Sequence, residues 1–92
     1  MAKATGAKQR KTHEKIFAKK TPNDIRWQDV LSLFENLGYT VVPLGGSNYS
    51  FWKNGRHITR HGPHPSPQTP AATIRVLKRF LEENGDTPWD KE

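Results

Sequence analysis

The stretch NYSFWKNGRHITRH, residues 48–61, decides the fold of this chain. At its centre, Asn54-Gly55 is the dipeptide that most strongly favours a two-residue type I′ turn, because both of its residues tolerate positive φ. The aromatic and β-branched side chains on either side of this turn are typical of strands. We therefore expect a β-hairpin with strands over residues 48–53 and 56–61.

A two-residue loop fixes which residues face each other across the hairpin. Trp52 is expected opposite His57, and Asn48 opposite His61. Because successive side chains of a strand point to opposite sides, the hairpin has two unlike faces. The face suited to burial under helices contains Tyr49, Phe51 and Ile58, with Lys53, Arg56 and Arg60 towards its edges. The face expected to meet solvent contains Asn48, Ser50, Trp52, His57, Thr59 and His61.

The residues before the hairpin predict a helix and a third strand. Over residues 25–37, apolar side chains recur at spacings of three and four, which indicates a helix with a buried stripe of Trp27, Val30, Leu31, Phe34 and Leu37. Asn23 or Asp24 is the expected N-cap, and Gly38 is the expected stop. Residues 39–44 then predict a strand, and Gly45-Gly46-Ser47 a flexible turn.

A second helix follows the hairpin. Thr69 is its expected N-cap, Pro70 suits the first helical position, and Gly85 marks its end. Its apolar stripe contains Ile74, Leu77, Phe80 and Leu81, and its outer stripe contains Arg75, Lys78, Arg79 and Glu82. The order α-β-β-β-α predicts an α+β domain, in which a three-stranded antiparallel sheet carries two helices on one face and leaves the other face open.

Charge divides the chain into segments. Of the 15 basic and 9 acidic side chains, residues 1–20 hold 7 and 1, so residues 21–92 hold 8 of each. Residues 1–22 also lack apolar periodicity, so we expect a disordered basic tail there, a folded domain over residues 23–85 and a frayed tail over residues 86–92. Alternatively, Trp89 can fold back onto the core. Because the tail and the acid-free stretch between Asn48 and Leu81 are both basic, the expected partner is a polyanion.

Composition narrows the class of protein. With 92 residues the chain is one domain, and its mean hydropathy of -0.88 allows only a small core. The absence of cysteine excludes disulfides and thiolate metal sites, and it fits a reducing cytoplasm. No apolar run is long enough to span a membrane, and no signal-peptide core follows the N-terminal lysines. We therefore expect a cytoplasmic protein with no membrane partner.

Three histidines provide the candidate chemistry. His57, His61 and His64 lie within eight residues, beside Arg56 and Arg60. A neutral histidine can take a proton from a ribose 2′-hydroxyl, because its usual pKa lies near working pH, and an arginine fork can hold phosphate oxygens. Zinc binding by the three imidazoles is an alternative, although no carboxylate lies nearby and the spacing matches no common zinc motif. Histidines that only accompany a proline-rich surface loop are the other alternative.

Trp52 and the basic side chains offer contacts to a nucleic acid. An indole on the solvent face can stack on an unpaired base, or it can pack against a partner protein. The basic helix face also has a purely structural explanation, since a helix needs a solvated side and Glu82 can pair with Lys78 or Arg79. The candidates for RNA contact are Lys53, Arg56, Arg60, Arg75, Lys78, Arg79 and Trp52.

Several short segments occur in a recognisable order. They are WQDVLSLFENLGY (residues 27–39), GGSNYSF (residues 45–51), the Asn-Gly turn, Pro-His-Pro (residues 63–65) and FLEENG (residues 80–85). In this order they resemble the HicA family of bacterial toxins, and the resemblance spans residues 25–85. It implies a fold similar to the double-stranded RNA-binding domain. It also implies an mRNA endonuclease that needs no metal or other cofactor and is held inactive by a HicB antitoxin.

Position 48 departs from the family pattern. The usual family motif has its essential histidine directly after Gly-Ser at the start of the second strand, where this chain has Asn48. An asparagine side chain cannot act as a general base at neutral pH. Since Asn48 faces His61 in the expected register, we hypothesise that the neighbouring strand supplies the histidine.

The sequence thus predicts a HicA-like toxin that cleaves mRNA by metal-free histidine acid/base chemistry, with a HicB-like antitoxin as protein partner. The catalytic candidates are Asn48, His57, His61 and His64. Two alternatives stay open. One is a non-catalytic RNA- or DNA-binding module of the same fold, and the other is a protein-interaction domain that uses the open sheet face.

Overall fold

The predicted hairpin forms the central strand and one edge strand of a three-stranded sheet. The computed structural model describes residues 6–63 and 67–89, and within them the sheet order is β1-β2-β3 with antiparallel pairing throughout. The strands are β1 (Thr40–Leu44), β2 (Asn48–Lys53) and β3 (Arg56–His61). The sequence therefore predicted all three strands to within one residue.

The turn and the register of the hairpin are confirmed. Asn54 and Gly55 have φ of 51° and 81°, which are the positive values that a type I′ turn requires. Trp52 lies opposite His57, and Asn48 lies opposite His61. Each of the six predicted cross-strand pairs is present, because a two-residue loop leaves no freedom to slip.

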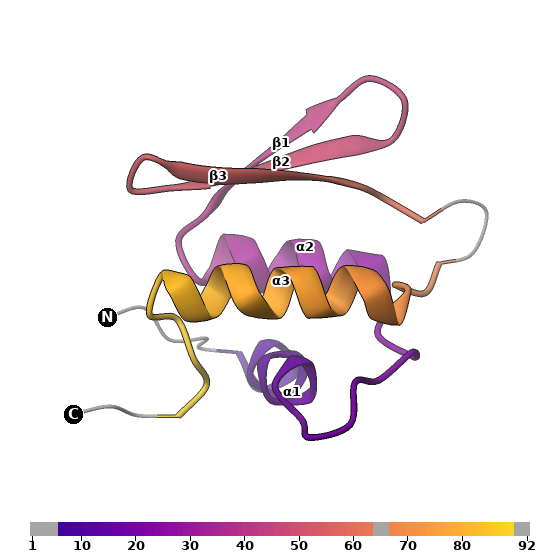
Figure 1. The fold of residues 1–92 in the computed structure, drawn as a ribbon, viewed down its shortest axis with the longest axis vertical. Coiled ribbons are helices and arrows are strands. Elements are labelled where there is room, and N and C mark those ends of the chain that lie inside the picture. The colour runs from indigo at the N-terminus through magenta and orange to yellow at the C-terminus, as the bar shows by residue number, and fades with distance from the viewer. Residues whose placement is uncertain (1–5, 64–66, 90–92) are drawn as a thin grey trace.

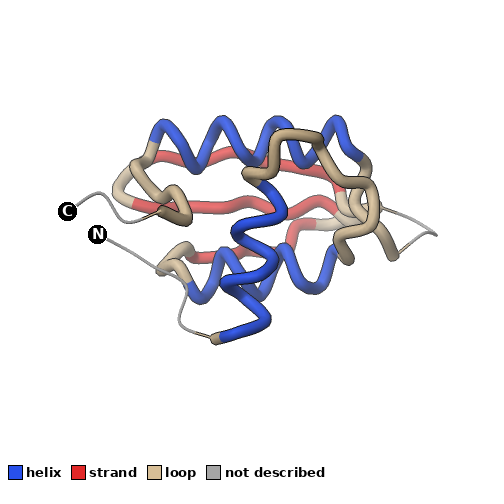
Figure 2. The backbone as a smooth tube through the Cα atoms, turned by 90° about the horizontal axis from the view of Figure 1, so that it is seen from below, coloured by secondary structure: helices blue, strands red, loops and turns tan. Residues whose placement is uncertain are grey.

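Three layers of secondary structure make up the fold. The helices α2 (Trp27–Asn36) and α3 (Ala71–Glu83) lie side by side beneath one face of the sheet (Figure 1). The helix α1 (Ala7–Ile16) crosses both of them on the side away from the sheet (Figure 2). The expected α+β arrangement is confirmed, and α1 adds a layer to it. No helix within the two described ranges is long and apolar enough to cross a membrane.

The helix α1 corrects the expectation that residues 1–22 are disordered. Thr12, His13, Ile16 and Phe17 are buried, the last of them just beyond the helix. These few side chains form too short a pattern to predict a helix from the sequence. They are buried because α2 and α3 offer a second apolar side, and packing against it stabilises a helix that would be marginal in isolation.

Because α1 covers α2 on the side away from the sheet, Leu33 is buried as well. We assigned Leu31 to the buried stripe, yet Leu31 is only partly buried and Leu33 is fully buried. Asp29 precedes Leu33 by one helical turn and forms an ion pair with Lys8 of α1, with 3.4 Å between Oδ1 and Nζ. The helix α1 therefore shields a flank of α2 that an arrangement of two layers would leave in solvent.

Both helices beneath the sheet begin later than expected. The N-cap of α2 is Arg26 rather than Asn23 or Asp24, and that of α3 is Pro70 rather than Thr69. The residues just before the two helices pair with each other instead. Trp27 N donates to Pro67 O at 2.8 Å, and Thr69 N donates to Ile25 O at 2.7 Å. This pairing holds the chain extended at residues 26 and 68, so neither helix can start before it.

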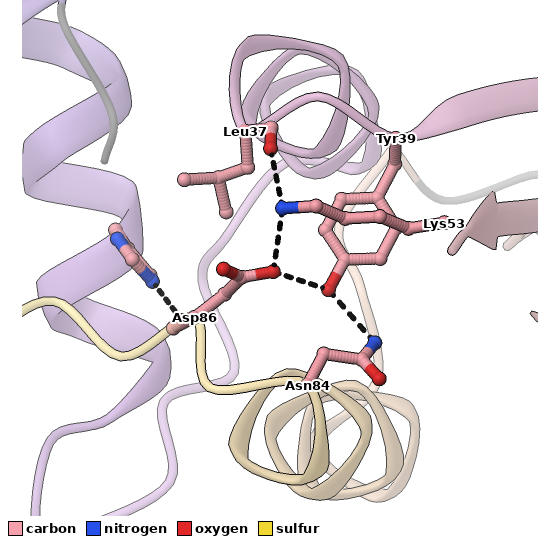
Figure 3. A network of polar contacts seen from close by, with 6 residues as sticks. Leu37, Tyr39, Lys53, Asn84 and Asp86 are labelled. Atoms are coloured by element: carbon pink, nitrogen blue, oxygen red, sulfur yellow. Dashed lines mark hydrogen bonds and ion pairs between the residues drawn. The ribbon is translucent and has the colours of Figure 1, made fainter. Parts of the chain in front are cut away.

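A buried carboxylate joins the layers beyond the end of α3. Asp86 Oδ2 accepts a hydrogen bond from the Tyr39 hydroxyl at 2.7 Å and another from Lys53 Nζ at 2.9 Å (Figure 3). The same ammonium donates to Leu37 O at 2.9 Å, and Asn84 Nδ2 donates to the Tyr39 hydroxyl at 2.9 Å. Asp86 is therefore part of the core, which corrects the expectation of a frayed segment from residue 86 onwards.

His13 attaches α1 to the same residue. Its Nε2 donates to the backbone oxygen of Asp86 at 2.8 Å, since a carbonyl oxygen can only accept. Phe17 packs edge-on against the rings of His13 and Trp89, with centroid distances of 5.6 Å and 5.4 Å, so the segment after α3 folds back over α1. Burial lowers the pKa of His13 from its usual value, although the backbone hydrogen bond to Asp86 opposes this shift.

Removal of the buried carboxylate should destabilise the fold strongly. We expect Asp86→Ala to lower the free energy of unfolding by about 3 kcal/mol, because the buried Lys53 ammonium then lacks its partner. Urea unfolding followed by circular dichroism measures this change. The control is Asp24→Ala, which removes an exposed ion pair with Lys15 and should cost less than about 0.5 kcal/mol. Equal losses in the two variants would contradict the role assigned to Asp86.

The stability of the protein should depend on pH through His13. Because burial lowers its folded pKa, the unfolded chain binds a proton first as the pH falls. The contribution of neutral, buried His13 to the free energy of unfolding is fully present above the pKa of about 6.5 that histidine has in the unfolded chain. This contribution is lost as the pH falls through the lower pKa of His13 in the folded protein. We expect His13→Gln, which keeps a donor for Asp86 O, to reduce the loss of stability at low pH. Urea unfolding at several pH values measures this loss. His57→Gln is the control and should leave the loss in place; if His13→Gln leaves it too, another group is responsible.

Candidate functional site

The open face of the sheet, on the side away from α2 and α3, holds much of the predicted site (Figure 1). By register it consists of three cross-strand rows. The end row is Leu44, Asn48 and His61, the middle row is Val42, Ser50 and Thr59, and the ring row is Thr40, Trp52 and His57. All are exposed or partly exposed except Ser50, whose small side chain in the central strand is covered by its neighbours.

Asn48 and His61 form a side-chain pair in the end row. His61 Nδ1 lies 3.1 Å from Asn48 Oδ1. The amide nitrogen of Asn48 donates to Gly45 O at 3.1 Å, and because that carbonyl can only accept, the amide oxygen must face the histidine. The turn Gly45-Gly46-Ser47, in which Gly46 and Ser47 have positive φ, brings this carbonyl back beneath Asn48.

This pair determines the tautomer of His61. An amide oxygen accepts only, so Nδ1 of His61 carries the proton when the imidazole is neutral. Nε2 then has a free lone pair and can accept a proton from a substrate hydroxyl. The imidazole is also held in one orientation, much as an oriented histidine is held in many active sites. The arrangement can therefore supply a positioned general base from β3 where β2 has an asparagine.

Gly62 fixes the place of His61 at the edge of a groove. It donates its backbone N–H to Ser47 O at 2.7 Å, and a Cβ at this position would lie 2.9 Å from Nε1 of the buried Trp27 indole. Glycine is therefore needed where the chain leaves β3. We did not single out Gly62 from the sequence, where its only signal was its place between His61 and Pro63. The groove has a volume of about 490 Å³ and is lined by Asn23, His61, Gly62, Pro63, Gln68, Thr69 and Pro70.

The histidines that the sequence grouped together do not converge on one point. His57 precedes His61 by four residues on β3, and at ~3.3 Å per residue their Cα atoms are about 13 Å apart. The His57 ring stacks on Trp52, with 4.0 Å between centroids and 10° between planes, whereas His61 pairs with Asn48. These two imidazoles do not point at a shared metal position. His64, the third candidate, lies outside the described residues.

Lys53 is not part of the open face. Its ammonium lies in the network around Asp86, with hydrogen bonds to the Asp86 carboxylate and to Leu37 O. It also lies 4.9 Å from the centroid of the Tyr39 ring. The sequence predicted an RNA contact for Lys53, but a cation that is already paired with a buried carboxylate is not available to a phosphate. We therefore remove Lys53 from the candidate surface.

The other basic candidates lie on different parts of the surface. Arg56 is exposed beside the hairpin turn, and Arg60 is half-buried with its Nε donating to Thr59 O at 2.8 Å. Arg75 and Arg79 are exposed on α3, in the layer below the sheet. Lys78 is half-buried, with Nζ 5.9 Å from the centroid of the Phe17 ring. The structure therefore separates the cations of α3 from the open face that holds Trp52.

Comparison with known protein families identifies most of the chain's folded region. A family model for the HicA toxin of bacterial toxin-antitoxin systems matches residues 27–85. The matched residues include α2, the three strands and α3, whereas α1 and Asp86 lie outside the match. No curated protein and no solved structure matches the chain.

The orientation of His61 can be tested without any substrate. We expect long-range ¹H–¹⁵N spectra of the neutral imidazole to show Nδ1 protonated and Nε2 unprotonated, because the Asn48 amide oxygen holds the Nδ1 proton. Asn48→Ala should shift the ring towards the Nε2–H form that free histidine prefers. His57, which makes no contact with Asn48, is the internal control and should not change. An Nε2–H form of His61 in the wild-type protein would contradict the assignment.

Proposed function

Because the chain belongs to the HicA toxin family, we propose that this toxin is an endoribonuclease that cleaves mRNA with His61 as its general base. The observation that carries the proposal is the pair of Asn48 and His61, in which 3.1 Å separates Oδ1 from Nδ1. The family's usual histidine position is occupied by Asn48, and the imidazole from β3 lies directly beside it. We propose that Asn48 orients this imidazole and that His61 performs the proton transfer.

The proposed reaction uses the RNA's own 2′-hydroxyl as nucleophile. Nε2 of His61 removes the hydroxyl proton, and the 2′-oxygen forms a bond to the adjacent phosphorus. The bond from phosphorus to the 5′-oxygen breaks, and that oxygen takes a proton from a general acid. The products are a 2′,3′-cyclic phosphate and a 5′-hydroxyl. We propose His64 as the acid, because His57 lies about 13 Å along the strand and is stacked on Trp52.

We propose two surfaces for the RNA backbone. Arg56 and Arg60 belong to the hairpin that carries His61, and a guanidinium can bind two phosphate oxygens at once. Arg75 and Arg79 are exposed on α3, which starts after the loop that leaves His61. Lys78 is half-buried against Phe17, so we assign it a smaller share of the binding. The basic residues of the N-terminal segment are a further, more distant source of attraction.

The family also implies a protein partner. Toxins of toxin-antitoxin systems act opposite an antitoxin, and this chain is such a toxin. We propose that the antitoxin resembles HicB. A non-catalytic nucleic-acid-binding module of the same fold is the second candidate function, and it is favoured by Asn48 standing where the family has a histidine.

Cleavage of a long, unstructured RNA in the presence of EDTA tests the proposal. We expect the wild-type protein to leave 2′,3′-cyclic phosphate ends, and His61→Ala to lose about 100-fold or more in rate, because general base catalysis contributes on that order. Asn48→Ala should lose less, since water can replace its hydrogen bond. His64→Ala tests the proposed acid.

His57→Ala is the matched control for His61→Ala, because both residues are exposed on the same face of β3. It should retain most of the cleavage rate at saturating RNA. Full activity in His61→Ala would remove His61 as the base. Tight RNA binding without cleavage by the wild-type protein would instead establish the non-catalytic candidate.

A further inference from the structure

The ring row has no role in the chemistry proposed for His61, although it holds the most exposed aromatic pair of the sheet. We infer that Trp52 and His57 form a stacking site for one unpaired RNA base, a few nucleotides from the bond that is cleaved at His61. The inference rests on the proposed nuclease function for its position relative to that bond. It names the substrate as single-stranded RNA, and it assigns Trp52 as the residue that touches the base.

The two rings already form a preorganised stack. Their centroids lie 4.0 Å apart and their planes differ by 10°, whereas the other aromatic pairs of the described chain are edge-on or tilted. Trp52 is 42% exposed and His57 is exposed as well, so the outer part of this stack meets solvent. A flat aromatic base can extend a stack of this kind, and such stacking tolerates any base because every base has a π-face. His57 acts as a positioning residue that holds the indole in one orientation.

The rows of the open face place the stack and His61 at a distance that suits a short strand of RNA. His57 and His61 are about 13 Å apart along β3. This length corresponds to about four nucleotides of stacked single strand at ~3.4 Å each, and to fewer where the strand is extended. The middle row between them consists of Val42, Ser50 and Thr59, which carry no charge and are smaller than the rings of Trp52 and His57. The backbone of the RNA can therefore cross the sheet at this row.

The charge of the open face favours an anionic ligand over a cationic one. The three strands contain no carboxylate, so nothing on the open face repels a phosphate. Arg56 is exposed at the end of β3 that lies beyond the stack, but its side chain points away from that of His57, so it reaches a phosphate only around the edge of the sheet. His61 lies at the other end. A chain of phosphates with unpaired bases matches this order of aromatic pair, uncharged middle row and proton acceptor.

The test uses an RNA that binds but cannot be cleaved. The cleaved bond is first mapped with the wild-type protein, and a short RNA is then made with a 2′-O-methyl group at the nucleotide that supplies the nucleophile. We expect this RNA to quench tryptophan emission, and Trp52→Leu to remove the quenching and weaken binding about 5-fold or more. Trp89→Leu is the matched control, because Trp89 is 50% exposed but lies beside Phe17 near α1. It should leave both the affinity and the quenching in place.

A scan with abasic nucleotides locates the stacked base. An abasic residue at one position, between one and about five nucleotides from the blocked bond, should weaken binding to the wild-type protein and leave binding to Trp52→Leu unchanged. His57→Phe, which keeps a ring on the indole, should bind better than His57→Ala. The inference is overturned if each abasic nucleotide lowers the RNA affinity of Trp52→Leu and of the wild-type protein by the same factor. It is also overturned if Trp52→Leu binds the intact RNA as tightly as the wild-type protein does.

The two proposals fail in different ways. Trp52-dependent quenching and binding without any cleavage would support the stacking site and reject the nuclease. Cleavage that requires His61 but is indifferent to Trp52 would support the nuclease and reject the stacking site. A Trp52→Leu protein that keeps its RNA affinity and loses only its antitoxin would assign the ring row to a protein partner, and this result also rejects the stacking site.

Discussion

The contact between Lys53 and Asp86 is the constraint on which the three layers depend. The ammonium comes from the sheet and the carboxylate from the segment after α3, with 2.9 Å between Nζ and Oδ2. Each group is held by further partners, because Lys53 also donates to the end of α2 and Asp86 also accepts from Tyr39. A buried ion pair is favourable only when its remaining hydrogen-bonding capacity is satisfied in this way. The sheet, α2 and α3 therefore meet at one point that tolerates few arrangements.

The contact between Lys53 and Asp86 lies at the C-terminal boundary of the region that matches the HicA family. The family match ends at residue 85, and Asp86 follows it directly. The helix α1, which lies before the match, reaches the same residue through His13. The segments on either side of the match thus contact each other beneath α2 and α3, through His13 with Asp86 and Phe17 with Trp89. The sheet lies on the opposite side, so this added layer leaves the open face and its histidines uncovered (Figure 1).

Local signals in the sequence were sufficient for the sheet and for the pair of Asn48 and His61. The Asn54-Gly55 turn fixes its own geometry, and every cross-strand pair of the hairpin follows from it. The features that escaped prediction all depend on contacts between distant residues. Nothing near His13 or Ile16 indicates the helix surface that buries them, and nothing near Thr69 indicates its backbone bond to Ile25. Lys53 was assigned to RNA because its partner Asp86 lies 33 residues away.

The contact between His13 and Asp86 has a consequence for the order in which the protein is built. The two residues are separated by 73 positions, so their hydrogen bond cannot form until most of the described chain has left the ribosome. The helix α1 is synthesised before α2 and α3, but its contacts with α3 and with Asp86 can form only after both helices have been made. The layer made first is therefore completed last. Until Asp86 has emerged, the basic helix α1 lacks the hydrogen bond that attaches it to the segment after α3.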